Sequence, residues 1–425
     1  MVSAISYQLS AVSRQLSAII FFVNFFFKIT MPFLLSFKNV FEYLIDQGIC
    51  TEQEKSLGKI EPKPAKNFNL LLTLPEGRKL LVKQEPYHQD GETVGEFLKE
   101  WRSQEFLRQF PEVSHLGSWL PEVLHFDPDN SIIVFNYLSD YQDLSEFYGK
   151  ENVFPKAIAS SIGAMVASIH RATLGGQDYQ DFFSEKSAEP SPDQAQNLSK
   201  DLERIGPEIF SQVPVDGLKF FALYQRYDSL GKAIAKLSNS FDACCLVHND
   251  LKLNNILLPN DWEQATSAPE SDGIVRLRLI DWERSSWGDP AFDLGSIITS
   301  YLTIWLSSLA VSKSIDIEEA LNLAMTPLEQ IQPSIAALIR TYCDRFPEIL
   351  ERYPNFLQRV MQFSGLALIQ TIQSIIEYQK SFGNTGICML QVAKSLLCRP
   401  EASIRTVFGI EESELIGLNQ ILHQV

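Results

Sequence analysis

The chain has 425 residues, which is enough for two domains that each bury a substantial core. Its formal net charge of −16 argues against nucleic-acid partners and against an anionic membrane surface, because both select basic protein surfaces. The six cysteines show no metal-ligand or CxxC spacing, so we expect a reduced, cytoplasmic location.

The first 30 residues contain an imperfect seven-residue repeat and then a phenylalanine-rich run over residues 21–27. No small-residue cleavage site follows this run, and it is too short to span a bilayer. We therefore expect residues 1–30 to be a dispensable extension, with Met31 as the functional start. The alternative is a membrane anchor, and we expect no other membrane contact.

The next segments predict a helix and a β-hairpin. Apolar residues at helical spacing over residues 39–55 indicate a short leading helix, with Gly48 as its stop. The apolar runs 66–74 and 79–84 are separated by Pro75-Glu-Gly77, which is typical of a hairpin turn.

A helix and two strands follow the hairpin. Residues 93–110 have the spacing of an amphipathic helix, and residues 120–127 and 131–138 are predicted to be strands.

The rest of the chain is predicted to be mostly helical. We expect a strong amphipathic helix over residues 155–172 and another over 219–237. Between them, residues 174–215 are rich in Ser, Pro, Asp and Gln, which indicates an insertion or flexible loop. Further helices are expected from residue 293 to about residue 398.

One polar loop between apolar runs carries the strongest chemical signal. The stretch 244–258 reads as a buried strand, a loop containing Asp250 and Asn255, and the first strand of a hairpin. The second strand, over residues 274–280, would deliver Asp281 beside this loop. Two carboxylates and one amide carbonyl are hard oxygen donors, which suit Mg²⁺.

Such a set is what phosphoryl transfer needs, because its transition state requires positioning and charge neutralisation. Each segment alone has an ordinary explanation, since an aspartate after a strand is usually a helix cap or a turn residue. Matching segments in the right order favour the catalytic interpretation.

The spacing His248-x-Asp250-x-x-x-x-Asn255, followed by Ile280-Asp281-Trp282-Glu283, resembles the aminoglycoside phosphotransferase and choline kinase superfamily of the protein-kinase-like fold. The segment 288–295 resembles the part of that family in which an aspartate, here Asp293, braces the catalytic loop. Asn249 stands where the family usually has glycine. Asparagine tolerates unusual backbone angles better than most residues.

This resemblance implies an α+β, two-lobed protein-kinase-like fold. The small lobe, over residues 31–138, would have an antiparallel sheet and bind nucleotide. The larger, mainly helical lobe, over residues 139–425, would carry the catalytic and metal loops, with the insertion at about 174–215.

The resemblance also implies roles for the residues of the two loops. Asp250 would be the catalytic base, and Lys252 would touch the γ-phosphate. Asn255 and Asp281 would hold Mg²⁺, whereas His248 would be a structural loop residue.

Other residues are implied to bind ATP. Lys83 would hold the α- and β-phosphates and pair with Glu100, with Glu96 and Glu105 as alternatives. Asn67 and Asn69 resemble an Asn-x-Asn phosphate loop, and the backbone of Asn136, Tyr137 and Leu138 would meet adenine.

The predicted activity is Mg-ATP-dependent phosphorylation of a hydroxyl on a small molecule. Aminoglycosides, choline or ethanolamine, methylthioribose and homoserine all stay open as acceptors. The alternative is a catalytically silent scaffold of the same fold that binds nucleotide or a partner. A protein kinase is disfavoured by Trp282-Glu283, where Phe-Gly is expected. The sequence does not predict the oligomeric state.

Overall fold

The computed structural model describes residues 33–88, 91–184, 214–267, 273–310 and 317–417. The expected extension 1–30 and most of the expected insertion lie outside these residues. None of the helices in the described residues has the length and hydropathy of a membrane span. The chain divides into two compact units. Unit 1 comprises Met1–Gly95 and Leu124–Phe135, and unit 2 comprises Glu96–Val123 and Asn136–Val425.

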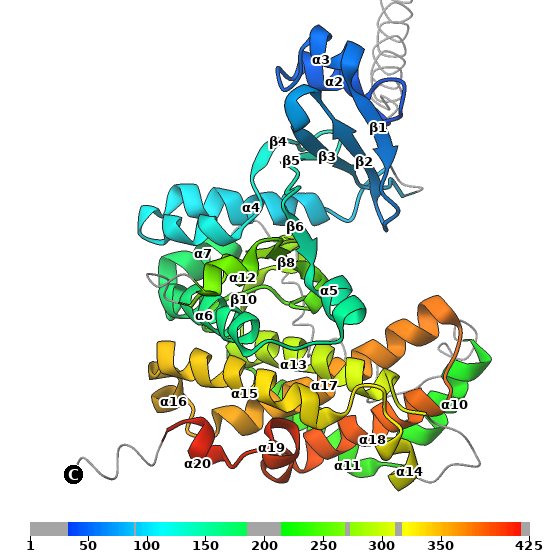
Figure 1. Ribbon diagram of the computed structural model, residues 1–425, viewed down its shortest axis with the longest axis vertical. Coiled ribbons are helices and arrows are strands. Elements are labelled where there is room, and N and C mark those ends of the chain that lie inside the picture. Colours follow the sequence, from blue (N-terminus) through cyan, green and yellow to red (C-terminus); the bar gives the residue numbers. More distant parts are fainter. Residues whose placement is uncertain (1–32, 89–90, 185–213, 268–272, 311–316, 418–425) are drawn as a thin grey trace, which may run out of the picture. The chain divides into compact units, whose positions relative to one another are not determined.

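Unit 1 is built on a five-stranded sheet with the strand order β1-β2-β3-β5-β4 (Figure 1). The predicted hairpin is confirmed, because β2 and β3 pair antiparallel with Leu71 opposite Leu81. The elements are α2 (Val40–Asp46), α3 (Glu52–Leu57), β1 (Lys59–Pro62), β2 (Phe68–Thr73), η1 (Pro75–Gly77), β3 (Lys79–Gln84), β4 (Val123–Asp127) and β5 (Ile132–Asn136).

One face of this sheet forms an apolar core with α2. Alternate residues of β2 and β3, such as Leu70 and Val82, are fully buried against Leu44 of α2. Gly48 has a φ of 70°, which confirms the predicted helix stop. The predicted segment also contains a second helix that was not predicted, because Thr51 starts α3 with its own capping box.

Unit 2 is mainly helical, and its tightest helix pair is α6 (Lys156–Thr173) with α15 (Leu328–Arg345). The predicted helix over 155–172 is confirmed. Gly163 lets the two helices approach closely, because a Cβ there would collide with the carbonyl of Leu338. The hydrogen-bonded pair His170 and Tyr342 joins the same two helices.

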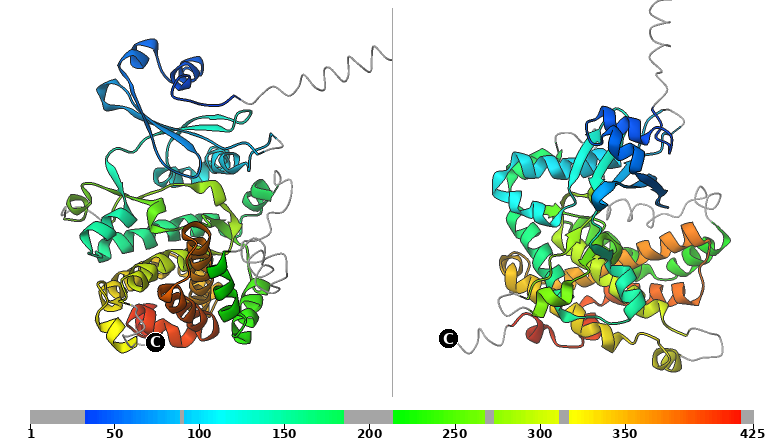
Figure 2. Two further views of the ribbon diagram at one scale, coloured as in Figure 1. Left: turned by 90° about the vertical axis from the view of Figure 1, so that its right-hand side faces the viewer. Right: turned by 45° about the horizontal axis from the view of Figure 1, so that its top comes forward.

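A second helical layer contains α13 (Pro290–Ser307), α17 (Phe356–Gln379) and α18 (Asn384–Cys398), which pack together (Figures 1 and 2). Gly295 is the point of close approach between α13 and α17, since a Cβ there would lie 2.7 Å from the backbone of Phe363. Thr299 then donates a hydrogen bond of 2.8 Å to the carbonyl of Ser364.

The expected single helix over 219–237 was wrong, because the structure has α10 (Val215–Tyr224) and α11 (Asp228–Asn239). The buried stripe of α10 ends at Tyr224 and that of α11 begins at Leu230. A continuous helix would turn these two positions about 120° apart. The break lets both stripes face the core.

Two small sheets position the polar loop predicted from the sequence. Strand β7 (Cys245–Val247) pairs with β10 (Ser286–Gly288), which the sequence did not indicate. Strand β8 (Ile256–Pro259) pairs antiparallel with β9 (Arg278–Leu279), so the predicted second hairpin is confirmed. A third strand, β6 (Tyr141–Asp143), lies on the other side of β8.

Unit 2 has further elements. They are α4 (Glu96–Gln109), η2 (Pro111–Trp119), α5 (Leu144–Glu151), α7 (Gln177–Ser184), η3 (Leu253–Asn255), α12 (Trp262–Ser267), η4 (Trp282–Arg284), α14 (Ile317–Asn322), α16 (Glu348–Arg352), α19 (Pro400–Phe408) and α20 (Glu412–Leu415).

Candidate active site

The loop between β7 and β8, residues 248–255, turns sharply at Asn249. This residue has a φ of 62°, in the left-handed region that glycine and asparagine tolerate best. Its side-chain Nδ2 donates to the carbonyl of Arg284 (3.0 Å) and to the Ser286 hydroxyl (2.7 Å). Asparagine therefore supplies the backbone angle and also two contacts that glycine could not make.

Asp293 braces this loop from the first turn of α13, as the sequence predicted. Its carboxylate is 2% exposed and accepts the backbone N–H groups of His248 (2.8 Å) and Asn249 (2.9 Å). His170 Nε2 lies 3.2 Å from the same carboxylate, and His170 Nδ1 lies 3.0 Å from the Tyr342 hydroxyl. The loop is thus tied through buried polar groups to α6 and α15.

Asp250 lies at the centre of the loop with two cations beside it. Lys252 Nζ is 2.6 Å and Arg284 Nη1 is 3.9 Å from its Oδ1. Burial raises the pKa of Asp250, but Lys252, and then Arg284 and His248, outweigh it and hold the pKa below its usual value. The carboxylate is therefore ionised at neutral pH.

Asn255 is positioned directly against Asp250. It is 2% exposed, and its Nδ2 donates to the backbone carbonyl of Asp250 (2.8 Å) and to Oδ2 of the same residue (3.3 Å). With the nitrogen engaged in this way, the amide oxygen is the atom available to a cation. That oxygen also accepts a hydrogen bond of 2.9 Å from Asn254.

The metal loop predicted around Asp281 is fixed to the catalytic loop by its neighbour Ile280. The N–H of Ile280 donates to the carbonyl of Asn255, and the carbonyl of Ile280 lies 2.9 Å from Nε2 of His248. His248 Nδ1 in turn lies 3.3 Å from the N–H of Asp250. The histidine therefore bridges the two loops and is engaged at both ring nitrogens.

Asp281 comes next along the chain, with φ and ψ both 60°. Antiparallel pairing of β8 with β9 brings Asn255 and Asp281 to the same end of the ladder. Among the described residues, no three His, Cys, Asp or Glu side chains are grouped to hold a metal. One amide oxygen and one carboxylate still fit Mg²⁺, which commonly takes one or two carboxylates and completes its shell with water and phosphate oxygens.

In unit 1, two of the predicted residues lie opposite each other in the sheet, and a third precedes strand β2. Asn69 and Lys83 are direct partners across β2 and β3, and Asn67 is two residues before Asn69. Lys83 Nζ lies 5.2 Å from the ring centre of Phe135. The side-chain oxygens of both asparagines are buried without a hydrogen-bond partner within the described residues. Asn69 and Lys83 alternate with residues of the apolar core formed with α2, so these two face away from it.

The other predicted nucleotide residues belong to unit 2. Glu100 lies on α4 and is 2% exposed, and the alternative Glu96 on the same helix is 9% exposed. Asn136 is held by Glu122, through its backbone N–H and through Nδ2, both at 3.0 Å. The carbonyls of Tyr137 and Leu138 accept N–H groups two and three residues ahead. The pairing of Glu100 with Lys83 and the adenine contacts stay predictions.

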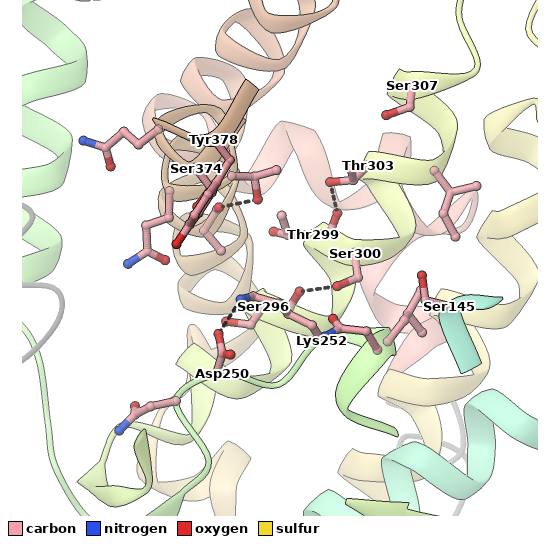
Figure 3. Close-up of a pocket in the computed structure, with 18 of the residues that line it drawn as sticks. Ser145, Asp250, Lys252, Ser296, Thr299, Ser300, Thr303, Ser307, Ser374 and Tyr378 are labelled. Carbon is pink, nitrogen blue, oxygen red and sulfur yellow. Dashed lines mark hydrogen bonds and ion pairs between the residues drawn. The ribbon is translucent and has the colours of Figure 1, made fainter. Parts of the chain in front are cut away.

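A pocket of about 770 Å³ opens beside Asp250 within unit 2 (Figure 3). Its walls are α13 and α17, and Lys252 and Arg284 also line it. The sequence reasoning did not identify these wall residues. The signal that could have found them is a series of hydroxyl side chains at helical spacing on α13, namely Ser296, Thr299, Ser300, Thr303 and Ser307.

Comparison with known proteins gives a family match over residues 65–316, to the phosphotransferase enzyme family. No functionally curated protein matches the chain. An ethanolamine kinase of Plasmodium vivax is 13% identical and has a TM-score of 0.51, over 86% of this chain and 91% of that one. At this identity the likeness shows the fold alone, and it confirms the α+β, protein-kinase-like fold.

Two further solved structures are similar over most of their length. The choline kinase LicA from Streptococcus pneumoniae is 17% identical, with a TM-score of 0.41, over 84% of this chain and 98% of that one. The ternary complex of streptomycin, ATP and APH(2″)-IIa is 15% identical, with a TM-score of 0.47, over 86% of this chain and 99% of that one.

Proposed function

Because the chain belongs to the phosphotransferase enzyme family, we propose that it transfers the γ-phosphoryl group of ATP to a hydroxyl of a small molecule. The observation that carries this proposal is the position of Asp250. An ionised carboxylate stands at the wall of a pocket, with Lys252 and Asn255 in contact with it.

In the proposed reaction, the acceptor hydroxyl enters the pocket and donates its proton to Asp250. Its oxygen forms a bond to the γ-phosphorus while the bond from that phosphorus to the β–γ bridging oxygen breaks. ADP leaves with the electron pair of that bond. Lys252, 2.6 Å from Asp250, is proposed to contact the γ-phosphate at the same time.

Asn255 and Asp281 are the residues proposed to hold Mg²⁺. Magnesium, when bound, neutralises charge on the phosphates. The hydrogen bonds of Asn255 to Asp250 and of Ile280 to Asn255 support this proposal, because they hold both loops at one end of the β8–β9 ladder. Such preorganisation reduces the entropy that binding must overcome.

We also propose that Lys83, Asn67 and Asn69 contact the ATP phosphates, that Glu100 supports this group, and that the backbone of residues 136–138 contacts adenine. The register that places Asn69 opposite Lys83 supports a shared polar surface in unit 1. All six cysteines are free, which suits a reducing cytoplasm where ATP is abundant.

The competing function is a silent scaffold that binds nucleotide without turnover. The test is ATP turnover with a panel of hydroxyl acceptors, for the wild type beside Asp250→Ala. We expect a loss of about 10²-fold or more in kcat, because a positioned base contributes that much.

Asp261→Ala is the matched control, since Asp261 is an exposed residue in the turn after β8. It should keep the wild-type rate. Equal rates for wild type and Asp250→Ala would contradict the proposed function.

A further inference from the structure

The side chains that line the pocket beside Asp250 limit the class of acceptor molecule that it can bind. Figure 3 shows hydroxyl side chains along α13, from Ser296 to Ser307, with Ser374 and Tyr378 of α17 across from them. Asp250 and Lys252 lie at one end. A volume of about 770 Å³ leaves room for a molecule with several polar groups.

Charge in the pocket does not favour a cationic acceptor. Besides Asp250, Glu377 is the one carboxylate among the described lining residues, and it is exposed. Lys252 and Arg284 line the same pocket, so positive and negative side chains balance. The single lining aromatic residue, Tyr378, is 76% exposed. An ammonium group is usually held by several carboxylates or by buried aromatic faces, and this pocket has neither.

The hydroxyls of the pocket walls are prepared as acceptors. Thr303 donates its O–H to the carbonyl of Thr299 (2.8 Å), and Thr371 donates to the carbonyl of Ala367 (3.0 Å). With the hydrogen committed to the helix, the oxygen lone pairs stay available to a donor in the pocket.

Other wall residues can donate. Ser296 is only 8% exposed, and its hydroxyl makes no hydrogen bond within the part of the chain that the structure describes, although it lines the pocket. Because this hydroxyl lines the pocket, it can donate a hydrogen bond to a ligand there. Gln370 and Gln373 of α17 add amide groups that both donate and accept.

We infer, on the premise of the proposed phosphotransfer, that the acceptor is a neutral polyhydroxylated molecule, such as a sugar or polyol. Each hydroxyl of such a molecule donates one hydrogen bond and accepts others, which matches walls that alternate acceptors with amide donors. A site built to bond hydroxyls rejects analogues that lack them.

The first experiment measures phosphate transfer from labelled Mg-ATP by the full chain to two sets of acceptors. The neutral set is ribose, glucose, fructose, mannitol and myo-inositol. The cationic set is choline, ethanolamine, streptomycin and gentamicin. We expect transfer to at least one neutral acceptor, with kcat/KM at least about 10-fold above every cationic one.

A second experiment adds negative charge to the pocket walls and measures whether the KM for the acceptor rises or falls. The double variant Gln370→Glu with Gln373→Glu preserves side-chain shape and adds two carboxylates. The inference predicts a KM for the neutral acceptor that is higher by about 10-fold, because amide donors are lost. A cation site would instead respond with a lower KM for the cationic acceptor.

Removal of a wall hydroxyl gives a third readout. Thr303→Val with Thr371→Val should raise the KM for the neutral acceptor about 10-fold and leave the KM for ATP unchanged. Thr406→Val, the same change at an exposed position of α19, is the matched control and should alter neither value.

The outcomes separate this inference from the proposed function. Asp250-dependent transfer that prefers the cationic set, or that reaches no neutral acceptor, overturns the inference and leaves the phosphotransferase intact. Binding of a neutral acceptor, measured by calorimetry with Mg-ATP present but without any transfer, overturns the proposed function instead. Transfer to a neutral acceptor that is unaffected by the wall variants also overturns the inference.

Discussion

The catalytic loop and the pocket walls are built in opposite ways. Asp293, which braces the loop, and His248 and Asn255 within it are each at most 2% exposed. Asp293 bonds to the N–H of His248, and His248 bonds to the carbonyl of Ile280, both distant in the sequence, whereas Asn255 bonds to Asp250 inside the loop. In the walls, Thr303 and Thr371 bond only to the carbonyl of their own preceding turn. The proposed chemistry thus depends on a network of linked polar groups, whereas the proposed acceptor recognition depends on side chains that can each be changed alone.

The largest effect is expected from Asp293→Ala. This change leaves the buried N–H group of His248 and the part-buried N–H group of Asn249 without an acceptor, at a cost of about 1–3 kcal/mol for the buried group. The free energy of unfolding, measured in urea, should fall by about 2–5 kcal/mol. Asp344→Ala, at an exposed position of α15, is the control and should stay within about 0.5 kcal/mol of wild type. A similarly small loss for Asp293→Ala would contradict the bracing role.

A smaller effect should separate two changes at Asn249. Glycine tolerates the φ of 62° but loses the contacts to Arg284 and Ser286, so Asn249→Gly should cost about 1 kcal/mol. Asn249→Ala adds the strain of a left-handed backbone and should be less stable than Asn249→Gly by about 1–2 kcal/mol. Urea unfolding of both variants gives the comparison, and the reverse order would show that the backbone angle is not limiting.

The pH dependence should change with Lys252→Met. The pKa of Asp250 is below its usual value, because Lys252 and Arg284 outweigh the effect of burial, so in wild type the base is lost only as the pH falls through that depressed value. Without Lys252 the pKa rises, and the acid limb of the kcat/KM profile should move to higher pH. Lys232→Met, at an exposed position of α11, should leave the limb in place. If the acid limb does not move in Lys252→Met, Asp250 is not the group whose titration produces that limb.

The smallest effect is expected in the pocket wall. Ser374 is exposed on α17, and its hydroxyl has no partner within the described residues. Ser374→Ala should change the free energy of unfolding by less than about 0.5 kcal/mol. Thermal and urea unfolding would check this expectation, and a loss comparable with that of Asp293→Ala would remove the contrast between the two regions.

Sequence reasoning succeeded where the signal is local. The strands on both sides of the loop are short apolar runs, and the loop residues have fixed spacing. The sequence alone was therefore enough to predict that Asp250 and Asn255 lie together. The partner of β7 was missed because Ser286–Gly288 is too short and polar to look like a strand. To predict the break between α10 and α11, one would have had to compare the directions in which the two apolar stripes face on a continuous helix.

The pocket could not be predicted, because one helix supplies only half of it. On α13 alone, Ser296 and Thr303 look like ordinary surface residues whose hydroxyls bond to the preceding turn. The second wall comes from α17, more than 60 residues later, and its polar residues alternate with buried apolar ones such as Ile372. Only tertiary packing shows that the two polar faces share one space.

The close contact between α6 and α15 also affects the loop that Asp293 braces. Gly163 and Leu338 are in contact there. One to two turns further along the helices, His170 is hydrogen-bonded to Tyr342 and to Asp293. A larger separation of α6 and α15 would therefore weaken the contacts of Asp293 that support the loop, although none of these four helix residues lines the pocket. Heat-sensitive mutants with intact nucleotide residues are expected to map to this pair of helices.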